Sequence, residues 1–222
     1  MSQLLAASGY RVGLTVSPHI EDYRERIQVF DQNSDRQDYF LNWISEDDLL
    51  STHDAILKAL GDHDLTYFEY TVLLALQAFS NLNMDIVVLE TGLGGRFDAT
   101  NICDHPILSV ITSIGLDHMH ILGDTKEKIL LEKLQIAKTG SDLYFAPEDL
   151  NLIDIANSYC LENQVTLLLP KENKNLEDPF ADKPKCYFLN YSPTIGIAEI
   201  LETKGLFIDW KKYFSIKKKY LP

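Results

Sequence analysis

Residues 85–101 constrain the fold of this chain more than any other stretch. The unbroken apolar run Ile86–Leu89 is rich in β-branched residues, which is the pattern of a strand buried on both faces. Glu90 follows the run directly, and three glycines in the next five residues allow the backbone to turn sharply and approach a ligand. Ligands of open parallel sheets bind just beyond the carboxyl ends of the strands, so this stretch is predicted to form the rim of an active site.

Strand and helix patterns alternate along the rest of the chain. Further strands are predicted over 10–16, 25–30, 107–114, 142–146, 164–169 and 186–191, and helices over 2–8, 46–60, 66–79, 126–138, 149–163 and 193–202. This alternation indicates an α/β fold, a mostly parallel sheet with flanking helices. One domain is expected, with its core in 1–170, a charged surface excursion over 171–185, and the last strand and helices over 186–222.

Charge and cysteine content exclude several classes of function. The net charge of −13 argues against a general nucleic-acid binder and means that an anionic ligand needs a local cation or a metal. The lysines near the C-terminus are interpreted as a solvated tail. No apolar stretch is long enough to span a bilayer, and the N-terminus lacks the features of a signal peptide. Three cysteines without a metal or redox spacing indicate a reducing compartment, so a cytoplasmic location is expected.

Polar side chains follow three of the predicted strands. Ser17, Glu90 and the pair Asp117-His118 each stand just past a strand end, and parallel strands would bring them to one edge of the sheet. A hydroxyl, a carboxylate and an imidazole, with room for water, suit an octahedral Mg²⁺ site that also holds substrate phosphates. A nucleophilic Ser-His-Asp triad is the alternative. It is disfavoured because Ser17 precedes a proline and lacks a strand-to-helix elbow.

The helix that begins near Thr66 carries two more candidates. Phe68 starts an apolar stripe at helical spacing, which most often means core packing. Glu69 lies three residues after Thr66, so it could either complete a capping box or contact a ligand, and both interpretations stay open.

Five stretches resemble the folylpolyglutamate synthases and bifunctional dihydrofolate synthases, relatives of the Mur ligases. They occur in the family's order, and the block that begins at Glu90 closely follows the family's signature. The matching stretches are Ser17-Pro18-His19 with Glu25-Arg26-Ile27, Leu65–Glu69, Glu90–Asn101, Thr112–His118 and Glu132-Lys133. Mur ligases proper share the fold but lack this loop and the Ser-Pro-His segment.

The resemblance implies an ATP-dependent amide ligase. Such enzymes phosphorylate a folate carboxylate to an acyl phosphate, which the amine of L-glutamate then attacks. The implied ligands are ATP, L-glutamate and folate or dihydropteroate, with Mg²⁺ as the cofactor and a monomer as the expected state. The implied roles are Mg²⁺ ligation by Ser17, Glu90 and His118, catalysis by His118 and by Lys133 (the lysine that the family often carbamylates), and substrate binding by Phe68, Glu69, Arg96 and Asp98.

The chain also departs from the family's pattern. No G-x-x-x-x-G-K-[ST] phosphate-binding loop occurs in its 222 residues, and Leu134-Gln135-Ile136 replaces the usual Ala-Gly-Ile. The expectation is a Mur-ligase-type central ATPase domain truncated at both ends, without its first strand, its phosphate loop and the C-terminal ligase domain. Impaired ligation by this chain alone is predicted. The alternatives are an inactive remnant that retains weak metal or folate binding, and another Mur-type amino-acid ligase.

Overall fold

The computed structural model describes residues 1–30, 42–171 and 185–220, and for 185–192 and 216–220 it describes the backbone alone. The chain forms two compact units. Unit 1 combines Met1–Gly92 with Phe207–Pro222, and unit 2 is Leu93–Leu206. Both units are α/β, with parallel strands flanked by helices, as predicted.

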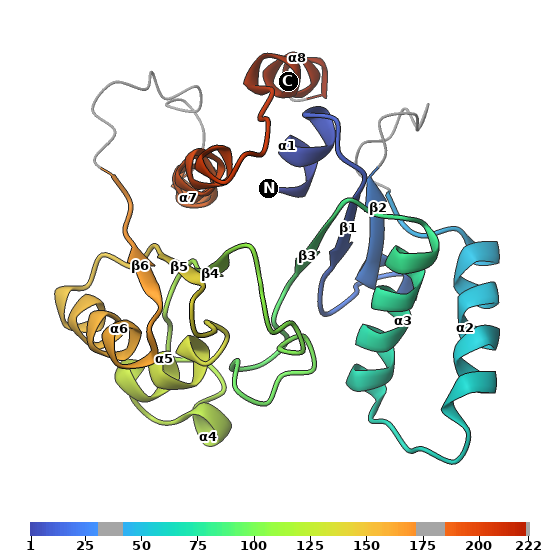
Figure 1. Cartoon of the computed structure of the whole chain (residues 1–222), viewed down its shortest axis with the longest axis horizontal. Coiled ribbons are helices and arrows are strands. Elements are labelled where there is room, and N and C mark those ends of the chain that lie inside the picture. The colour runs from blue at the N-terminus through green and yellow to red at the C-terminus, as the bar shows by residue number, and fades with distance from the viewer. Residues whose placement is uncertain (31–41, 172–184, 221–222) are drawn as a thin grey trace. The chain divides into compact units, whose positions relative to one another are not determined.

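Unit 1 is built on a three-stranded sheet of order β2-β1-β3 (Figure 1). The central strand β1 runs parallel to β3 and antiparallel to β2, so that Thr15 lies opposite both Leu89 and Ile27. Helix α3 packs against the sheet and α2 packs against α3. The elements of the unit are α1 (Ser2–Ala7), β1 (Val12–Thr15), the 3-10 helix η1 (Tyr23–Arg26), β2 (Ile27–Phe30), α2 (Glu46–Leu60), α3 (Tyr67–Asn81), β3 (Ile86–Leu89) and α8 (Trp210–Tyr220).

Close packing in unit 1 accounts for Gly13, and side-chain caps account for where α2 and α3 begin. A Cβ on Gly13 would lie 2.6 Å from Cδ1 of the buried Phe79 ring, so the central strand can take no side chain there. Ser45 and Thr66 are the N-caps of α2 and α3, where each hydroxyl accepts the backbone N–H three residues on. Both helices begin where the capping pattern of the sequence predicts.

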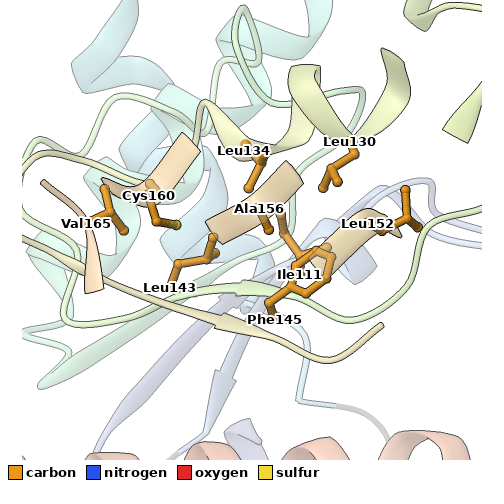
Figure 2. Packing of buried hydrophobic residues seen from close by; sticks show 10 residues of the cluster. Ile111, Leu130, Leu134, Leu143, Phe145, Leu152, Ala156, Cys160 and Val165 are labelled. Atoms are coloured by element: carbon orange, nitrogen blue, oxygen red, sulfur yellow. The ribbon is translucent and has the colours of Figure 1, made fainter. Parts of the chain in front are cut away.

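Unit 2 has a wholly parallel sheet of order β4-β5-β6. Figure 2 shows its core, in which side chains from the sheet meet side chains from α5 and α6. Leu134, Leu143 and Phe145 are completely buried there. The elements are β4 (Ser109–Ile111), α4 (Met119–Leu122), α5 (Lys126–Leu134), β5 (Asp142–Phe145), α6 (Leu150–Asn163), β6 (Thr166–Leu168) and α7 (Lys185–Thr203).

Two local predictions are wrong. The strand expected over 186–191 belongs to the helix α7, because a short apolar run fits a strand and a buried helix equally well. Strand β3 is not buried on both faces. Val87 is 39% exposed to solvent. Strand β3 is also an edge strand of the described sheet, where it pairs with β1 alone. The C-terminal lysines belong to α8, where Lys211 and Lys212 are exposed.

Most of the surface excursion predicted over 171–185 lies outside the described residues. Among the described helices, none combines the length and the apolar character needed to cross a membrane.

Candidate active site

Ser17 and Glu90 meet at one edge of the sheet in unit 1. Strands β1 and β3 run in the same direction, and the Glu90 N–H donates to the Thr15 carbonyl at 3.1 Å, one residue beyond the sheet. Ser17 then follows β1 after one residue, and its backbone N–H donates to Glu90 Oε2 at 2.9 Å. The Ser17–Pro18 peptide bond is cis. The parallel register therefore places the carboxylate and the serine together, as strand ends should be.

The oxygens at this edge fit a hard cation. The Ser17 hydroxyl and Glu90 Oε1 make no hydrogen bond within the described residues, and Glu90 is exposed. Mg²⁺ prefers oxygen ligands and keeps several waters, so two protein oxygens can suffice when substrate phosphates supply others. The described residues contain no group of three or more His, Cys, Asp or Glu side chains that could hold a metal by themselves.

His118 belongs to unit 2, where it precedes α4. Its backbone is left-handed, with φ 51°, and its N–H donates to Asp117 Oδ1 at 2.7 Å. The imidazole is half exposed, with Nε2 lying 3.8 Å from Asp117 Oδ2 and its ring centroid 6.4 Å from that of His120. A non-glycine residue in this conformation marks a constrained position. Its predicted convergence with Ser17 and Glu90 joins two units and stays a prediction.

Asp98 organises the glycine-rich loop. Its carboxylate accepts the backbone N–H of Leu93 at 2.8 Å and that of Thr100 at 2.9 Å, as well as the Thr100 hydroxyl. Its backbone N–H in turn donates to the Gly95 carbonyl at 3.3 Å. A carboxylate that accepts several N–H groups fixes a loop in one conformation. Asp98, predicted to bind substrate, thus already holds the loop from inside.

Gly95 fastens the same loop to the last turn of α5. A Cβ at this position would lie 2.7 Å from the Glu132 carbonyl oxygen and 3.1 Å from Lys133 Cα. Only glycine allows the two backbones to approach so closely. The signature loop and the half-buried Lys133, two separate predictions from the sequence, are therefore neighbours in unit 2.

Phe68 lies against the start of the loop, within unit 1. A Cβ on Gly92 would lie 2.6 Å from Cζ of the Phe68 ring, so the ring covers the backbone at this glycine. Phe68 is half-buried, at the first turn of α3. Phe68 is predicted both to start the apolar stripe of this helix and to line the substrate cleft. Its ring packs against the loop that begins the candidate rim.

Glu69 completes a capping box. Its Oε2 accepts the Thr66 N–H at 2.8 Å, and its own N–H donates to Thr66 Oγ1 at 3.3 Å. The hydrogen bonds from Thr66 lower the pKa of the Glu69 carboxyl. Of the two interpretations left open, the structure shows the cap. Arg96 is exposed, and its guanidinium lies 4.8 Å from the centroid of the neighbouring Phe97 ring.

Glu25 is a positioning residue to which the sequence assigned no role, although it lies in one of the matching stretches. Its carboxylate accepts three successive backbone N–H groups, those of Ile20, Glu21 and Asp22, each at 2.8 Å, and these bonds lower its pKa. They fold the segment that follows Ser17. The signal was present in the sequence, because Asp22 and Glu25 have the spacing of a capping box, which the structure confirms at the start of η1.

Comparisons with known proteins agree on one group of enzymes. No family model matches the chain. The dihydrofolate synthase/folylpolyglutamate synthase of Buchnera aphidicola subsp. Schizaphis graminum is 44% identical over 140 residues, which are 63% of this chain and 31% of that protein. The Escherichia coli FolC structure with DHPP and ADP matches with a TM-score of 0.75 at 29% identity, over 96% of this chain and 51% of that one. The structure of the Yersinia pestis folylpolyglutamate synthase/dihydrofolate synthase with AMPPNP and a Mn ion matches with a TM-score of 0.74 at 29% identity. The match covers 96% of this chain and 51% of that one.

Proposed function

Because the chain belongs to the folylpolyglutamate synthase/dihydrofolate synthase family, we propose that it contributes to an ATP-dependent ligase that adds L-glutamate to tetrahydrofolate and to dihydropteroate. The chain spans about half the length of the matched structures and about a third of that of the curated relative. The observation that carries the proposal is the hydrogen bond from the Ser17 N–H to the Glu90 carboxylate, which assembles two signature segments into one edge.

We assign the metal to this edge, and the ion as Mg²⁺. Ser17 Oγ and Glu90 Oε1 would bind the ion, and His118 stays the further ligand that the sequence predicts. Bound there, Mg²⁺ would neutralise the charge of the phosphates during phosphoryl transfer. The Ser17 N–H holds the other carboxylate oxygen, so Glu90 meets the ion in a fixed orientation.

The substrate-binding role falls to the loop and to α3. Phe68 presents an aromatic ring beside Gly92, which suits stacking against a flat heterocycle such as that of a folate. Asp98 would hold the loop in shape for the substrate, and Arg96 offers an exposed guanidinium on the same loop. Lys133, beside Gly95, is the proposed carbamylation site, where a cation would become a carboxylate-like ligand.

We expect this chain of 222 residues to be a poor catalyst by itself. Phosphoryl transfer depends on positioning and charge stabilisation, and the phosphate-loop pattern that supplies both in this superfamily is missing from its sequence. Turnover slower than about 1 per second, the low end of ordinary enzymes, is the proposed result.

The test is ATP-dependent incorporation of labelled L-glutamate, with tetrahydrofolate and dihydropteroate as separate acceptors. Slow product formation that needs ATP and is lost in Glu90→Gln would support the proposal. Folate and metal binding without any product would identify a remnant that has lost ligation. Incorporation of a different amino acid in place of glutamate would identify another Mur-type ligase.

A further inference from the structure

Arg26 is a buried cation without a carboxylate partner in the described part of the chain. Its residue surface is only 8% exposed, and no Asp or Glu oxygen of the described residues pairs with it. The neighbouring Arg24 differs, because its guanidinium pairs with Asp22 at 2.8 Å and with Glu46 at 3.5 Å. Arginines that are almost fully buried are normally paired, so Arg26 breaks a general rule.

Two neutral rings hold the Arg26 side chain in place. Its Nε donates to His19 Nδ1 at 2.7 Å, and its Cζ lies 5.5 Å from the centroid of the Tyr67 ring. Arginine Nε always carries a proton, so His19 Nδ1 is the acceptor and the imidazole proton resides on Nε2. Neither ring carries the negative charge that would compensate the guanidinium.

The terminal nitrogens of Arg26 are free to bind a ligand. They make no hydrogen bond to the described residues, and they are not among the side-chain atoms sealed from solvent without a partner. His19 thus holds the Nε edge of the guanidinium and Tyr67 packs against its face, while the two terminal nitrogens keep unused donors. A fixed fork with open donors is preorganised for binding.

The residue also stands next to the candidate rim. The Arg26 carbonyl accepts the Val16 N–H at 3.3 Å, and Val16 immediately precedes Ser17. On the other side of β1, Glu90 binds the backbone at Thr15 and Ser17. Arg26 and Glu90 therefore flank the same short piece of chain within unit 1.

We propose that Arg26, oriented by His19 and Tyr67, forms an oxyanion-binding site in unit 1. The planar guanidinium matches carboxylate and phosphate groups, which it binds through two parallel N–H bonds. The bound group could come from an organic acid or from a phosphate compound, and both present the same pair of oxygens. The site rests on the geometry of unit 1 alone and stands whether or not the chain ligates glutamate.

The test is nuclear magnetic resonance on the whole ¹⁵N-labelled chain, read at the Arg26 Nε–H signal. The signal is assigned by its Overhauser contact with the Tyr67 ring and by its loss in Arg26→Lys. Sodium glutarate and sodium phosphate are added separately, against sodium chloride at equal ionic strength. The expected result is a saturable shift with a dissociation constant on the order of 1–10 mM, a weak affinity. The Arg24→Lys variant is the matched control, because Arg24 is already paired, and the Arg26 shift should persist in it.

Each outcome decides the proposal. A shift with glutarate alone identifies a carboxylate site, a shift with phosphate alone identifies a phosphate site, and a shift with both supports a general oxyanion site. An Arg26 signal that moves no further than in sodium chloride overturns the proposal. If Arg26→Lys fails to fold, the Tyr67 contact still assigns the signal, and the parent chain with Arg24→Lys still gives the answer.

Discussion

The backbone N–H of Ser17 donates a 2.9 Å hydrogen bond to Oε2 of Glu90, which lies 73 residues further along the chain. The parallel pairing of β1 and β3 makes this contact, because it ends both strands at the same level. The bond uses one carboxylate oxygen, and the other, Oε1, makes no hydrogen bond within the described residues and can accept a cation.

The pH dependence of stability should report on Glu25. Its pKa is lowered below the ordinary 4.5 by the N–H groups of Asp22, Ile20 and Glu21, so its ionised form stabilises the fold. That contribution is complete above the unfolded-state pKa and is lost as the pH falls through the lower, folded-state value. Urea unfolding should therefore show Glu25→Gln clearly less stable than the parent at pH 7, with the gap narrowing below about pH 4.5. The Glu21→Gln control removes an exposed charge instead, and its stability at pH 7 should stay close to that of the parent.

Asp98→Ala should loosen the signature loop. It removes the acceptor of the Leu93 and Thr100 N–H groups, and hydrogen bonds to charged groups contribute about 1.5–3 kcal/mol each. Hydrogen exchange of the Leu93 amide should become at least about tenfold faster, which corresponds to about 1.4 kcal/mol. Arg96→Ala, on the exposed side of the loop, is the control and should leave that rate unchanged. Equal exchange in Asp98→Ala and the parent would mean that the carboxylate does not organise the loop.

Gly95→Ala should destabilise unit 2. The new Cβ would meet the Glu132 carbonyl at 2.7 Å, and because this is backbone it cannot swing aside. Overpacking of this kind costs about 1–3 kcal/mol. Gly115→Ala is the matched control, since nothing lies within 4 Å of its Cβ, and it should change stability by less than about 0.5 kcal/mol. Similar urea midpoints for the two variants would contradict the close packing of the loop on α5.

Thr66→Ala should cost about 1 kcal/mol by removing the N-cap of α3. Its effect tests the structural interpretation of Glu69, whose carboxylate accepts the Thr66 N–H. Denaturant unfolding of Thr66→Ala, Glu69→Ala and the double variant measures the coupling between the two residues. Strictly additive losses would mean that the capping box does not act as a unit, and would return Glu69 to the list of possible ligand contacts.

The helix starts could be predicted because they depend on neighbouring residues. Burial by residues distant in the sequence could not be predicted. Ser45 and Thr66 predict the starts of α2 and α3, because an N-cap hydrogen bond joins residues only three apart in the sequence. The run 186–191 is helical although a strand is predicted, because apolar side chains without a clear period suit either structure. The pairing of Ser17 with Glu90 followed from the parallel order of strands. The unpaired burial of Arg26 had no signal, since it depends on side chains from His19 and Tyr67 meeting only in the folded unit.

Titration of the chain with Mn²⁺, followed by electron paramagnetic resonance of the free ion, tests the metal assignment most directly. Glu90→Gln keeps the shape of the side chain and an acceptor for the Ser17 N–H but removes the charge. We expect its dissociation constant for Mn²⁺ to rise at least about tenfold, a loss of about 1.4 kcal/mol, with an unchanged melting temperature. Glu21→Gln, which removes one exposed charge from the same unit, should bind as the parent does. A Glu90→Gln chain that binds Mn²⁺ as tightly as the parent would contradict the assignment of the metal to this edge.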